Sequence, residues 1–365
     1  MLTRAKTKEL FTGKLLTDDQ KLNTELNLKE INERKIVLKS IPRRLVFELT
    51  NTCNMNCIMC GRNTENFKPS YLNMDDFMWF KPLFDKIEEV TFMGWGEPTM
   101  HPNFYDMLKI LDKYSARKYI CTNGVKLNEL KEVIFDAHVD MLAISINGVT
   151  SQTNNYIRRG SDLNKIVASL RDIIRMKKEK DLKWPYMSFV FCAMRSNLHE
   201  LPLVIDLAAD IGLQRVKVVY LTAFSKNMIN ETLWGYEDEV KSIFDKSIVQ
   251  AQVHGIEIEL PYISGEDPSG DKYHKDCFVG WRDFFLGSDR FIRPCMSTSE
   301  KLLKLDKMKE FNDIWNSEEF KQHRLHVNSE SMKLNCKRCY QSTYCNWNHK
   351  NAFIQVGEEF SPSWE

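Results

Sequence analysis

Short apolar runs alternate with longer helix-periodic stretches from residue 44 onward, and this alternation limits the possible folds more than any other feature of the sequence. Six runs have the length and β-branched or aromatic content of strands: RLVFELT (44–50), EEVTFMGW (88–95), RKYICTN (117–123), VDMLAISI (139–146), YMSFVFCA (186–193) and QRVKVVYL (214–221). Strands that alternate with amphipathic helices are typical of βα units around a parallel sheet. Because six strands are too few for a closed eight-stranded barrel, we expect an α/β fold with a partial (β/α)6 barrel.

The segments on either side of this repeat predict two further parts of the chain. Residues 1–43 have the composition of a helical and irregular N-terminal extension. Beyond residue 221, LWGYEDEVKSIFDKSIVQAQVHG predicts one more helix, GIEIEL a strand, and the Gly/Pro/Asp-rich SGEDPSGDKYHKD a linker. We therefore expect an N-terminal extension over 1–43, a TIM-like partial barrel over 44–262 and a small C-terminal domain over 263–365.

Charge and hydropathy narrow the classes of partner. The chain has 51 lysines and arginines against 50 acidic residues, so no strong field attracts nucleic acid, an anionic membrane surface or acidic substrates. No apolar run is long enough to span a membrane, and the N-terminal MLTRAKTKELFTGKLL lacks the apolar core of a signal peptide. We expect a cytoplasmic protein with neither a membrane nor a nucleic-acid partner.

Cysteine is the residue type that points most directly to chemistry. The reducing cytoplasm argues against disulfides among the ten cysteines, and their clustering favours metal or redox chemistry. Cys121 and Cys192 stand alone in apolar runs, where a cysteine is usually a small buried hydrophobe. The other eight form two groups, at positions 53, 57 and 60 and at positions 277, 295, 336, 339 and 345.

The first group lies in TCNMNCIMCG (52–61), directly after the first predicted strand. Cys53, Cys57 and Cys60 therefore belong to a βα loop at the carboxyl end of the sheet, where α/β barrels place their active sites. Three thiolates can hold three irons of a cubane cluster whose fourth iron keeps an open position. A zinc site completed by a distant residue and a chance spacing remain as alternatives.

The spacing Cys53-x3-Cys57-x2-Cys60 after the first strand resembles the signature of the radical S-adenosylmethionine (radical SAM) superfamily. Gly94-Trp95-Gly96-Glu97-Pro98, directly after the second strand, is similar to the Gly-Gly-Glu-Pro segment of that family. The resemblance implies a 4Fe-4S cluster, S-adenosyl-L-methionine bound at the open iron with its amino group on the Gly94–Glu97 backbone, and a 5'-deoxyadenosyl radical as the product of its cleavage. Two positions depart from the pattern: Met59 stands where an aromatic residue is common, and Trp95 splits the glycine pair.

The same resemblance implies cofactor contacts at the ends of later strands. Asn123 ends the third strand on the carboxyl side, and Ser145 and Arg158 would contact the cofactor's carboxylate. A guanidinium fork suits a carboxylate geometrically. Asn147 would contact the ribose, and Leu221, at the end of the sixth strand, would line the adenine pocket. The alternative is structural: both asparagines supply turns before a glycine, and Arg158 is solvated.

The second cysteine group is followed by no further cysteine, and by spacing alone it is either a zinc ribbon or a second cluster. Beside the front motif it resembles the C-terminal auxiliary-cluster domains called SPASM, with two clusters, and Twitch, with one. His349 stands where the longer form has its next cysteine, which favours one auxiliary 4Fe-4S cluster. Its four expected ligands are Cys277, Cys295, Cys336 and Cys339. A degenerate second site that uses Cys345 remains an alternative.

A fully ligated auxiliary cluster is suited to taking an electron from a substrate radical, so we expect net oxidation of a small-molecule, carbohydrate-like or peptide substrate. Reduced flavodoxin or ferredoxin would supply electrons. The short N-terminal extension favours small molecules over ribosomal peptides. The first alternative is a redox-neutral epimerase in which Cys192 or Cys345 returns a hydrogen atom. An alternative of another class is a non-catalytic metal-binding or electron-transfer protein.

Oxidation also needs a base that removes a proton from the substrate. Asp283 is the candidate, with Asp289 and Arg293 in the same segment near the cluster cysteines. Polar residues predicted to face the barrel interior are candidate substrate contacts, and each is as readily structural: Glu48, Thr91, Arg195 and Tyr220.

Overall fold

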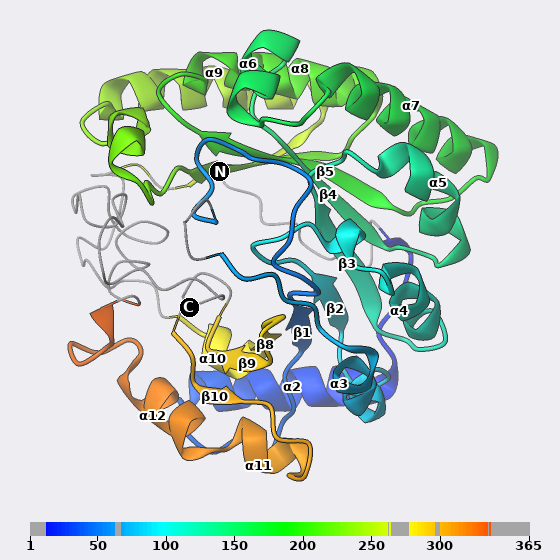
Figure 1. Ribbon diagram of the computed structural model, residues 1–365, viewed down its shortest axis with the longest axis vertical. Helices are drawn as coiled ribbons and strands as arrows, with labels where there is room; N and C mark the ends of the chain where they lie inside the picture. Colours follow the sequence, from blue (N-terminus) through cyan, green and yellow to red (C-terminus); the bar gives the residue numbers. More distant parts are fainter. Residues whose placement is uncertain are drawn as a thin grey trace.

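The computed structural model describes residues 12–62, 67–261, 263, 277–295, 300–334 and 336. Within them, ten strands form one sheet in the order β10-β9-β8-β1-β2-β3-β4-β5-β6-β7 (Figure 1). The strands are β1 Arg44–Phe47, β2 Glu89–Phe92, β3 Arg117–Thr122, β4 Met141–Ile146, β5 Tyr186–Ala193, β6 Arg215–Tyr220, β7 Glu257–Glu259, β8 Asp283–Leu286, β9 Phe291–Arg293 and β10 Leu303–Lys304.

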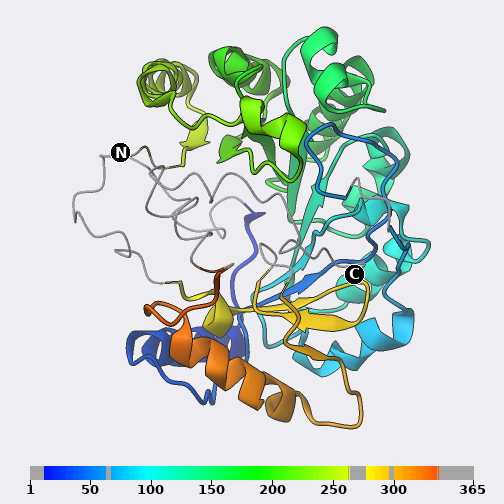
Figure 2. The ribbon, with the colours of Figure 1, turned by 60° about the vertical axis from the view of Figure 1, so that its left-hand side comes forward.

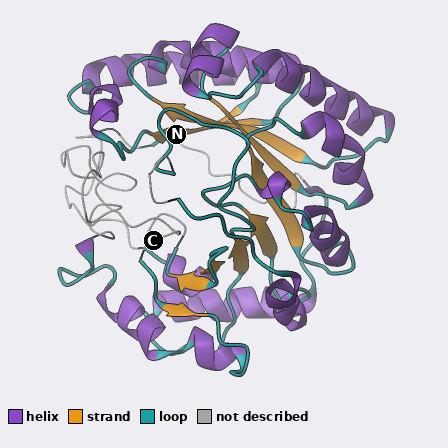
Figure 3. Ribbon diagram, viewed as in Figure 1, coloured by secondary structure: helices purple, strands orange, loops and turns teal. Residues whose placement is uncertain are grey.

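Helices cover the outer face of this curved sheet (Figure 3). The α-helices are α2 Asp18–Asn32, α3 Met74–Trp79, α4 Phe104–Leu111, α5 Leu127–Asp136, α6 Ser151–Ile157, α7 Leu163–Glu179, α8 Leu201–Ile211, α9 Glu237–His254, α10 Val279–Arg282, α11 Phe311–Trp315 and α12 Glu318–His326. Short 3-10 helices are η1 Lys81–Leu83, η2 Pro98–Met100, η3 Leu198–Glu200 and η4 Lys226–Glu231.

The predicted α/β partial barrel is confirmed. All six predicted strands form, and β1 to β6 pair in parallel in chain order. GIEIEL supplies β7, which pairs in parallel with β6 at one edge of the sheet. The described strands do not close into a ring, because β7 and β10 occupy opposite edges of the order. The carboxyl ends of β1 to β6 therefore share one rim around an open barrel.

The C-terminal part of the chain extends the sheet beyond β1, which the sequence did not reveal. β8 pairs in parallel with β1, with Arg44 opposite Asp283 and Phe47 opposite Leu286, and β9 and β10 follow in antiparallel fashion. All four residues of β8 are buried. β1 therefore has a partner on both sides, β2 from the barrel and β8 from the segment that carries the second cysteine group.

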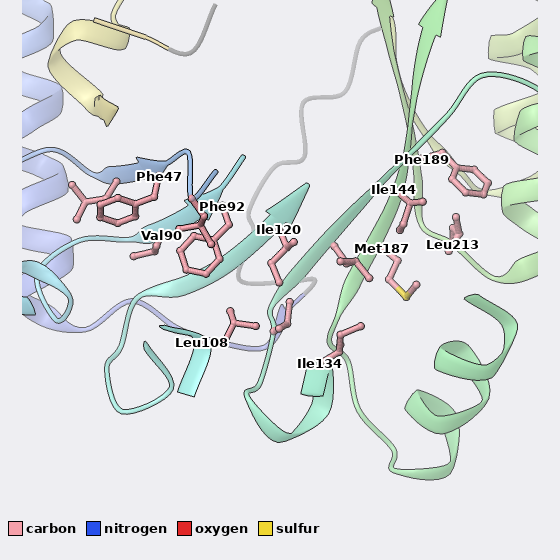
Figure 4. Packing of buried hydrophobic residues seen from close by; sticks show 14 of the residues in the cluster. Phe47, Val90, Phe92, Leu108, Ile120, Ile134, Ile144, Met187, Phe189 and Leu213 are labelled. Carbon is pink, nitrogen blue, oxygen red and sulfur yellow. The ribbon is translucent and has the colours of Figure 1, made fainter. Parts of the chain in front are cut away.

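Apolar packing between the sheet and its helices forms the core. Figure 4 shows Phe47, Phe92, Ile120, Ile144 and Phe189 of successive strands among these side chains. One stripe of α7 is buried in the same core: Ile166, Leu170, Ile173 and Ile174. A stripe of this spacing places one helix face on the sheet and leaves the charged face in water.

The N-terminal helix α2 lies beside the C-terminal helices (Figures 1 and 2). A capping box between Thr17 and Gln20 starts α2, and the Gln20 side chain also donates to the Ile87 carbonyl at 2.6 Å. The Asn27 side chain donates to the Trp281 carbonyl of α10 at 2.9 Å. The predicted N-terminal extension thus contacts both the barrel and the C-terminal segment. Among the described residues, none of the helices combines the length and apolar character needed to cross a membrane.

An ion pair with a buried carboxylate joins β1 to β8. Arg44 forms an ion pair with Asp283, and Arg282 donates to the same carboxylate at 2.7 Å through Nε and through Nη2. Burial alone would raise the pKa of Asp283, but the two guanidinium groups hold it below its ordinary value. The stabilisation is therefore fully present at neutral pH and is lost as the pH falls through the lowered pKa.

We predict that Asp283→Asn destabilises the protein by about 3 kcal/mol at pH 7, because it removes the buried carboxylate that pairs with the half-buried guanidinium groups of Arg44 and Arg282. The measurement is denaturant-induced unfolding of anaerobically reconstituted protein, followed by tryptophan fluorescence. Asp172→Asn is the matched control, because Asp172 also has two basic partners, Lys131 and Arg175, at 3.3 Å each but lies at the surface. It should leave the unfolding midpoint close to that of the wild type, because ion pairs at the surface contribute little to stability. Equal unfolding midpoints for the two variants would contradict the assignment.

Candidate active site

The cysteine loop lies at the carboxyl end of β1 and rests on the end of α6. The Asn56 N–H donates to the Arg159 carbonyl at 2.8 Å, and the Ile58 N–H donates to the Ile157 carbonyl at 2.9 Å. Within the loop, the Cys60 N–H donates to the Cys57 carbonyl at 3.1 Å. These backbone bonds fix the loop at the rim of the barrel, as its position after the first strand predicted.

The three front cysteines share one electrostatic environment. Burial raises the pKa of each thiol, and Arg62 acts on all three in the opposite direction. Each pKa also responds to a neighbouring thiol of the group, so the side chains of Cys53, Cys57 and Cys60 lie near one another. Within the described part of the chain, no three His, Cys, Asp or Glu side chains already form a metal-binding group.

Arg62 is a residue that the motif did not single out. Its Nη2 donates to the Met55 carbonyl at 2.7 Å, and its charge favours the thiolate form of the nearby cysteines. A basic residue two positions after the last cysteine of the motif was the available signal.

The Gly94–Glu97 loop lies directly against the start of the cysteine loop. The Glu97 N–H donates to the Thr52 carbonyl at 2.8 Å. A Cβ atom on Gly96 would lie 2.3 Å from the Thr50 carbonyl oxygen and 2.4 Å from that of Thr52. Only glycine allows this approach of two backbones. The Trp95 ring that separates the two glycines packs against Phe224, with centroids 5.5 Å apart.

Glu97 and Asn123 connect this loop to the end of β3. The buried Glu97 carboxylate accepts hydrogen bonds of 2.7 Å from the hydroxyls of Thr99 and Thr122 and from the Asn123 N–H. The Asn123 side chain donates to the Asn54 side chain at 2.7 Å and lies 3.6 Å from the Cys53 sulfur. In this structure, Glu97 therefore shapes the loop, and Asn123 reaches the first cysteine.

Arg158 and Asn147 meet at the ends of β4 and β5. Arg158 is 7% exposed, and its Nη1 donates to the Asn147 side-chain oxygen at 3.2 Å. The Asn147 side chain donates to the Cys192 carbonyl at 2.9 Å. The buried Arg158 Nε has no hydrogen-bond partner among the described residues. Ser145 lies in β4, two residues before Asn147. Burial raises the pKa of the neighbouring Cys121 thiol to about 11, and Ser145 acts in the opposite direction.

A small apolar cluster, separate from the main core, lies beside the cysteine loop. Its buried members are Ile157, Met194, Leu221, Ala223 and Met228, and Ile58, Met59, Cys192 and Ile229 pack against them. Leu221, which the resemblance assigned to the adenine pocket, and Met59 thus belong to one cluster. Burial raises the pKa of the Cys192 thiol to about 12, so it keeps its hydrogen at neutral pH.

The structure does not bring Asp283 to this rim. Asp283 begins β8 opposite Arg44, at the amino end of the parallel strands, and its carboxylate is engaged by Arg44 and Arg282. Its position therefore explains stability rather than contact with a substrate. Asp289 lies in the turn after β8 and pairs with Arg293, the last residue of β9, at 2.6 Å.

The polar residues expected in the barrel interior have different surroundings. Thr91 donates to Glu89 at 2.8 Å, Arg195 lies 4.2 Å from the Tyr236 ring centroid, and the Tyr220 ring stacks on Phe244 of α9. The first is bound within the sheet, and Tyr220 faces the helical layer. Glu48 is fully buried and bonds backbone groups, as described below.

The auxiliary cysteines are half-buried where they are described. The Cys277 N–H donates to the Asn328 side-chain oxygen at 2.7 Å, and the Asn328 side chain donates back to the Cys277 carbonyl at 3.0 Å. Asn328 has φ 73°, a left-handed conformation that asparagine tolerates better than most residues. Cys295 follows β9 by two residues, and Cys336 packs against the main core. Cys339, Cys345 and His349 lie outside the described residues.

Comparisons with known proteins agree with this geometry. Residues 47–184 match the radical SAM superfamily, and residues 277–340 match the iron-sulfur cluster-binding domain SPASM. The chain is 22% identical over 320 residues to a tungsten-containing aldehyde ferredoxin oxidoreductase cofactor-modifying protein of Pyrococcus furiosus, covering 83% of this chain and 88% of that protein. It is 23% identical over 348 residues to an AdoMet-dependent heme synthase of Methanosarcina barkeri, covering 88% and 95%.

Among solved structures, Streptococcus suis SuiB bound to S-adenosylmethionine superposes with a TM-score of 0.64 at 14% identity, covering 88% of this chain and 77% of SuiB. At this identity the likeness shows a common fold. The two matched regions contain the front and the auxiliary cysteines respectively. The chain therefore belongs to the radical SAM superfamily, as an enzyme with a 4Fe-4S cluster, S-adenosylmethionine and a C-terminal SPASM domain for auxiliary iron-sulfur binding.

Proposed function

We propose that this enzyme is a radical oxidoreductase that dehydrogenates a small-molecule, carbohydrate-like or peptide substrate. The observation that carries the proposal is the pairing of β8 with β1, since Cys277 and Cys295 flank a hairpin that belongs to the barrel sheet itself. An auxiliary cluster on these cysteines is thus attached to the barrel wall, and full ligation suits it to electron transfer rather than substrate binding. Two relatives named for cofactor modification and heme synthesis favour a small molecule.

The residues at the rim fit the cofactors that the family uses. Cys53, Cys57 and Cys60 would hold the front cluster, since three neighbouring thiols lie beside the positive charge of Arg62. When bound, the cluster and S-adenosylmethionine supply the radical chemistry that removes a hydrogen atom from the substrate. The buried, unpartnered Nε of Arg158 fits the cofactor carboxylate, because a buried N–H without an acceptor is costly.

The other contacts that we expect with S-adenosylmethionine are polar at its amino group, carboxylate and ribose, and apolar at its adenine. The Gly94–Glu97 backbone would receive the amino group of the cofactor, with Glu97 holding the loop to β3. Ser145 and Asn147 lie at the end of β4, where the resemblance assigns them to the carboxylate and the ribose. The apolar cluster around Leu221 and Met59 would exclude water beside the adenine. Asp289 replaces Asp283 as the candidate base by position. Reduced flavodoxin or ferredoxin would supply the electron.

A second candidate function is epimerisation without net oxidation. It is favoured by Cys192, whose thiol is protonated at neutral pH and whose pKa responds to both Arg158 and Cys57 of the rim. A thiol in this position can return a hydrogen atom to the substrate. Cys192→Ala would then abolish inversion while S-adenosylmethionine cleavage continues, and an unchanged product would exclude this role.

We predict that the two cysteine groups separate cofactor cleavage from oxidation. Cys57→Ala should abolish 5'-deoxyadenosine formation, whereas Cys295→Ala should retain cleavage but keep about four irons per chain instead of about eight. Iron analysis and mass spectrometry after anaerobic reconstitution with dithionite and S-adenosylmethionine measure both. Substrate oxidation in Cys295→Ala would contradict the role of the auxiliary cluster. Zinc without cleavage in the wild type would instead support a non-catalytic metal-binding or electron-transfer protein.

We predict that Arg158→Ala weakens S-adenosylmethionine binding by about 10- to 100-fold, because a hydrogen bond between charged groups contributes about 1.5–3 kcal/mol. Arg158→Lys should recover only part of this affinity, since an ammonium lacks the planar fork. Equilibrium dialysis with labelled cofactor gives the dissociation constant, and iron content shows whether the front cluster is intact. Arg171→Ala, at an exposed position on α7, is the control. Wild-type affinity in Arg158→Ala would refute this contact.

We predict that the Asn328 side chain preorganises Cys277 for its cluster. Asn328→Gly removes the amide but accepts the positive φ, so it isolates the two hydrogen bonds from backbone strain. It should lower auxiliary iron without changing 5'-deoxyadenosine formation, and Asn328→Ala should do the same with an added loss of stability. Electron paramagnetic resonance distinguishes the clusters. A wild-type iron content of the auxiliary cluster in Asn328→Gly would show that the two hydrogen bonds between Asn328 and Cys277 are not needed for cluster binding.

A further inference from the structure

Glu48 is a fully buried carboxylate at the end of β1, and its partners are in two distant parts of the chain. Oε1 accepts a 2.8 Å hydrogen bond from the Trp95 N–H, 47 residues away in sequence. Oε2 accepts from the Ser288 hydroxyl at 2.8 Å and from the Ser288 N–H at 3.2 Å, 240 residues away. A carboxylate buried to 0% exposure needs such donors, because burial without them is costly.

The first partner lies in the loop that we assign to S-adenosylmethionine. Trp95 stands between Gly94 and Gly96, so a bond to its peptide N–H holds the centre of that loop. A Cβ atom on Gly94 would lie 2.3 Å from the Glu48 Cγ, which shows how closely the loop backbone packs on this side chain. The Glu48 side chain therefore sets how far the loop stands from β1.

The second partner lies in the turn between β8 and β9, in the segment with the auxiliary cysteines. Ser288 is 3% exposed, and its hydroxyl is also 2.6 Å from the Ser70 hydroxyl, beyond the cysteine loop. The Ser70 N–H in turn donates to the Asn51 side chain at 2.8 Å. Ser288 thus contacts both the carboxylate under the Gly94–Glu97 loop and the chain that surrounds the cysteine loop.

We propose that Glu48 and Ser288 form a positioning pair that holds the Gly94–Glu97 loop in its cofactor-binding shape. The affinity for S-adenosylmethionine therefore depends on the position of the β8–β9 turn. The inference rests on the assignment of this loop under the proposed function. Without the Ser288 donors, part of the buried carboxylate lacks compensation, and the side chain that supports Trp95 can shift. Neither residue needs to touch the cofactor.

The test uses reconstituted full-length enzyme and the variants Ser288→Ala, Ser288→Thr and Glu48→Gln. Ser288→Ala should raise the dissociation constant for S-adenosylmethionine about tenfold, with the Michaelis constant for the cofactor rising while the rate at saturating cofactor changes less than about twofold. Ser288→Thr keeps the hydroxyl and should restore the affinity. Glu48→Gln should weaken binding at least as much as Ser288→Ala. A glutamine amide has one oxygen, so it cannot accept hydrogen bonds from both the Trp95 and the Ser288 N–H groups. Ser115→Ala is the matched control, because it also removes a hydroxyl that donates to a carboxylate, that of Asp85 at 3.0 Å, but just before the amino end of β3.

Iron content and the paramagnetic resonance signal of the reduced front cluster, with and without cofactor, complete the experiment. Wild-type affinity in Ser288→Ala overturns the inference, and so does a loss of iron that accompanies the loss of affinity, because it indicates general damage. Failure of the proposed oxidation is a separate outcome, since cofactor affinity is measured without any substrate. If the wild type itself does not bind S-adenosylmethionine, the loop assignment fails and the inference with it.

Discussion

The parallel pairing of β1 with both of its neighbours is the interaction on which the rest of the structure depends. At its amino end, the buried Arg44–Asp283 pair joins it to β8. At its carboxyl end, Glu48 and the cysteine loop follow within a few residues. One short strand therefore carries an ion pair at one end and the chemical machinery at the other. Changes in its pairing would act on stability and on cofactor binding together.

The rim of the barrel separates charges from neutral groups. The front thiols lie near Arg62, and Arg158 acts on Cys57, so positive charge is available where thiolates must form. Cys192 belongs to the apolar cluster beside the same loop, and burial keeps its thiol neutral. The same residue type thus has two different environments at one rim, and the difference comes from the neighbours rather than from the cysteine.

The six barrel strands and β7 could be predicted from sequence because each is a β-branched or aromatic run with clear boundaries. The hairpin of β8 and β9 could not be predicted. DFFL and FIR are short, and β8 forms by pairing with β1, whose Arg44 is 239 residues earlier in the chain than Asp283. The same limit applies to side chains. The spacing of Cys53, Cys57 and Cys60 identified the loop, whereas nothing near Glu48 indicated Ser288, and nothing near Asp283 indicated Arg44. Pairs that form only through long-range pairing leave no local signal.

The order of strands in the sheet also bears on synthesis of the chain. β1 emerges early, but its neighbour β8 belongs to the C-terminal part of the chain, so one edge of β1 has unpaired backbone groups until translation passes Leu286. Exposed strand edges pair readily with other chains. A nascent chain of this protein therefore has an unpaired strand edge next to its front cysteine loop until β8 pairs with β1.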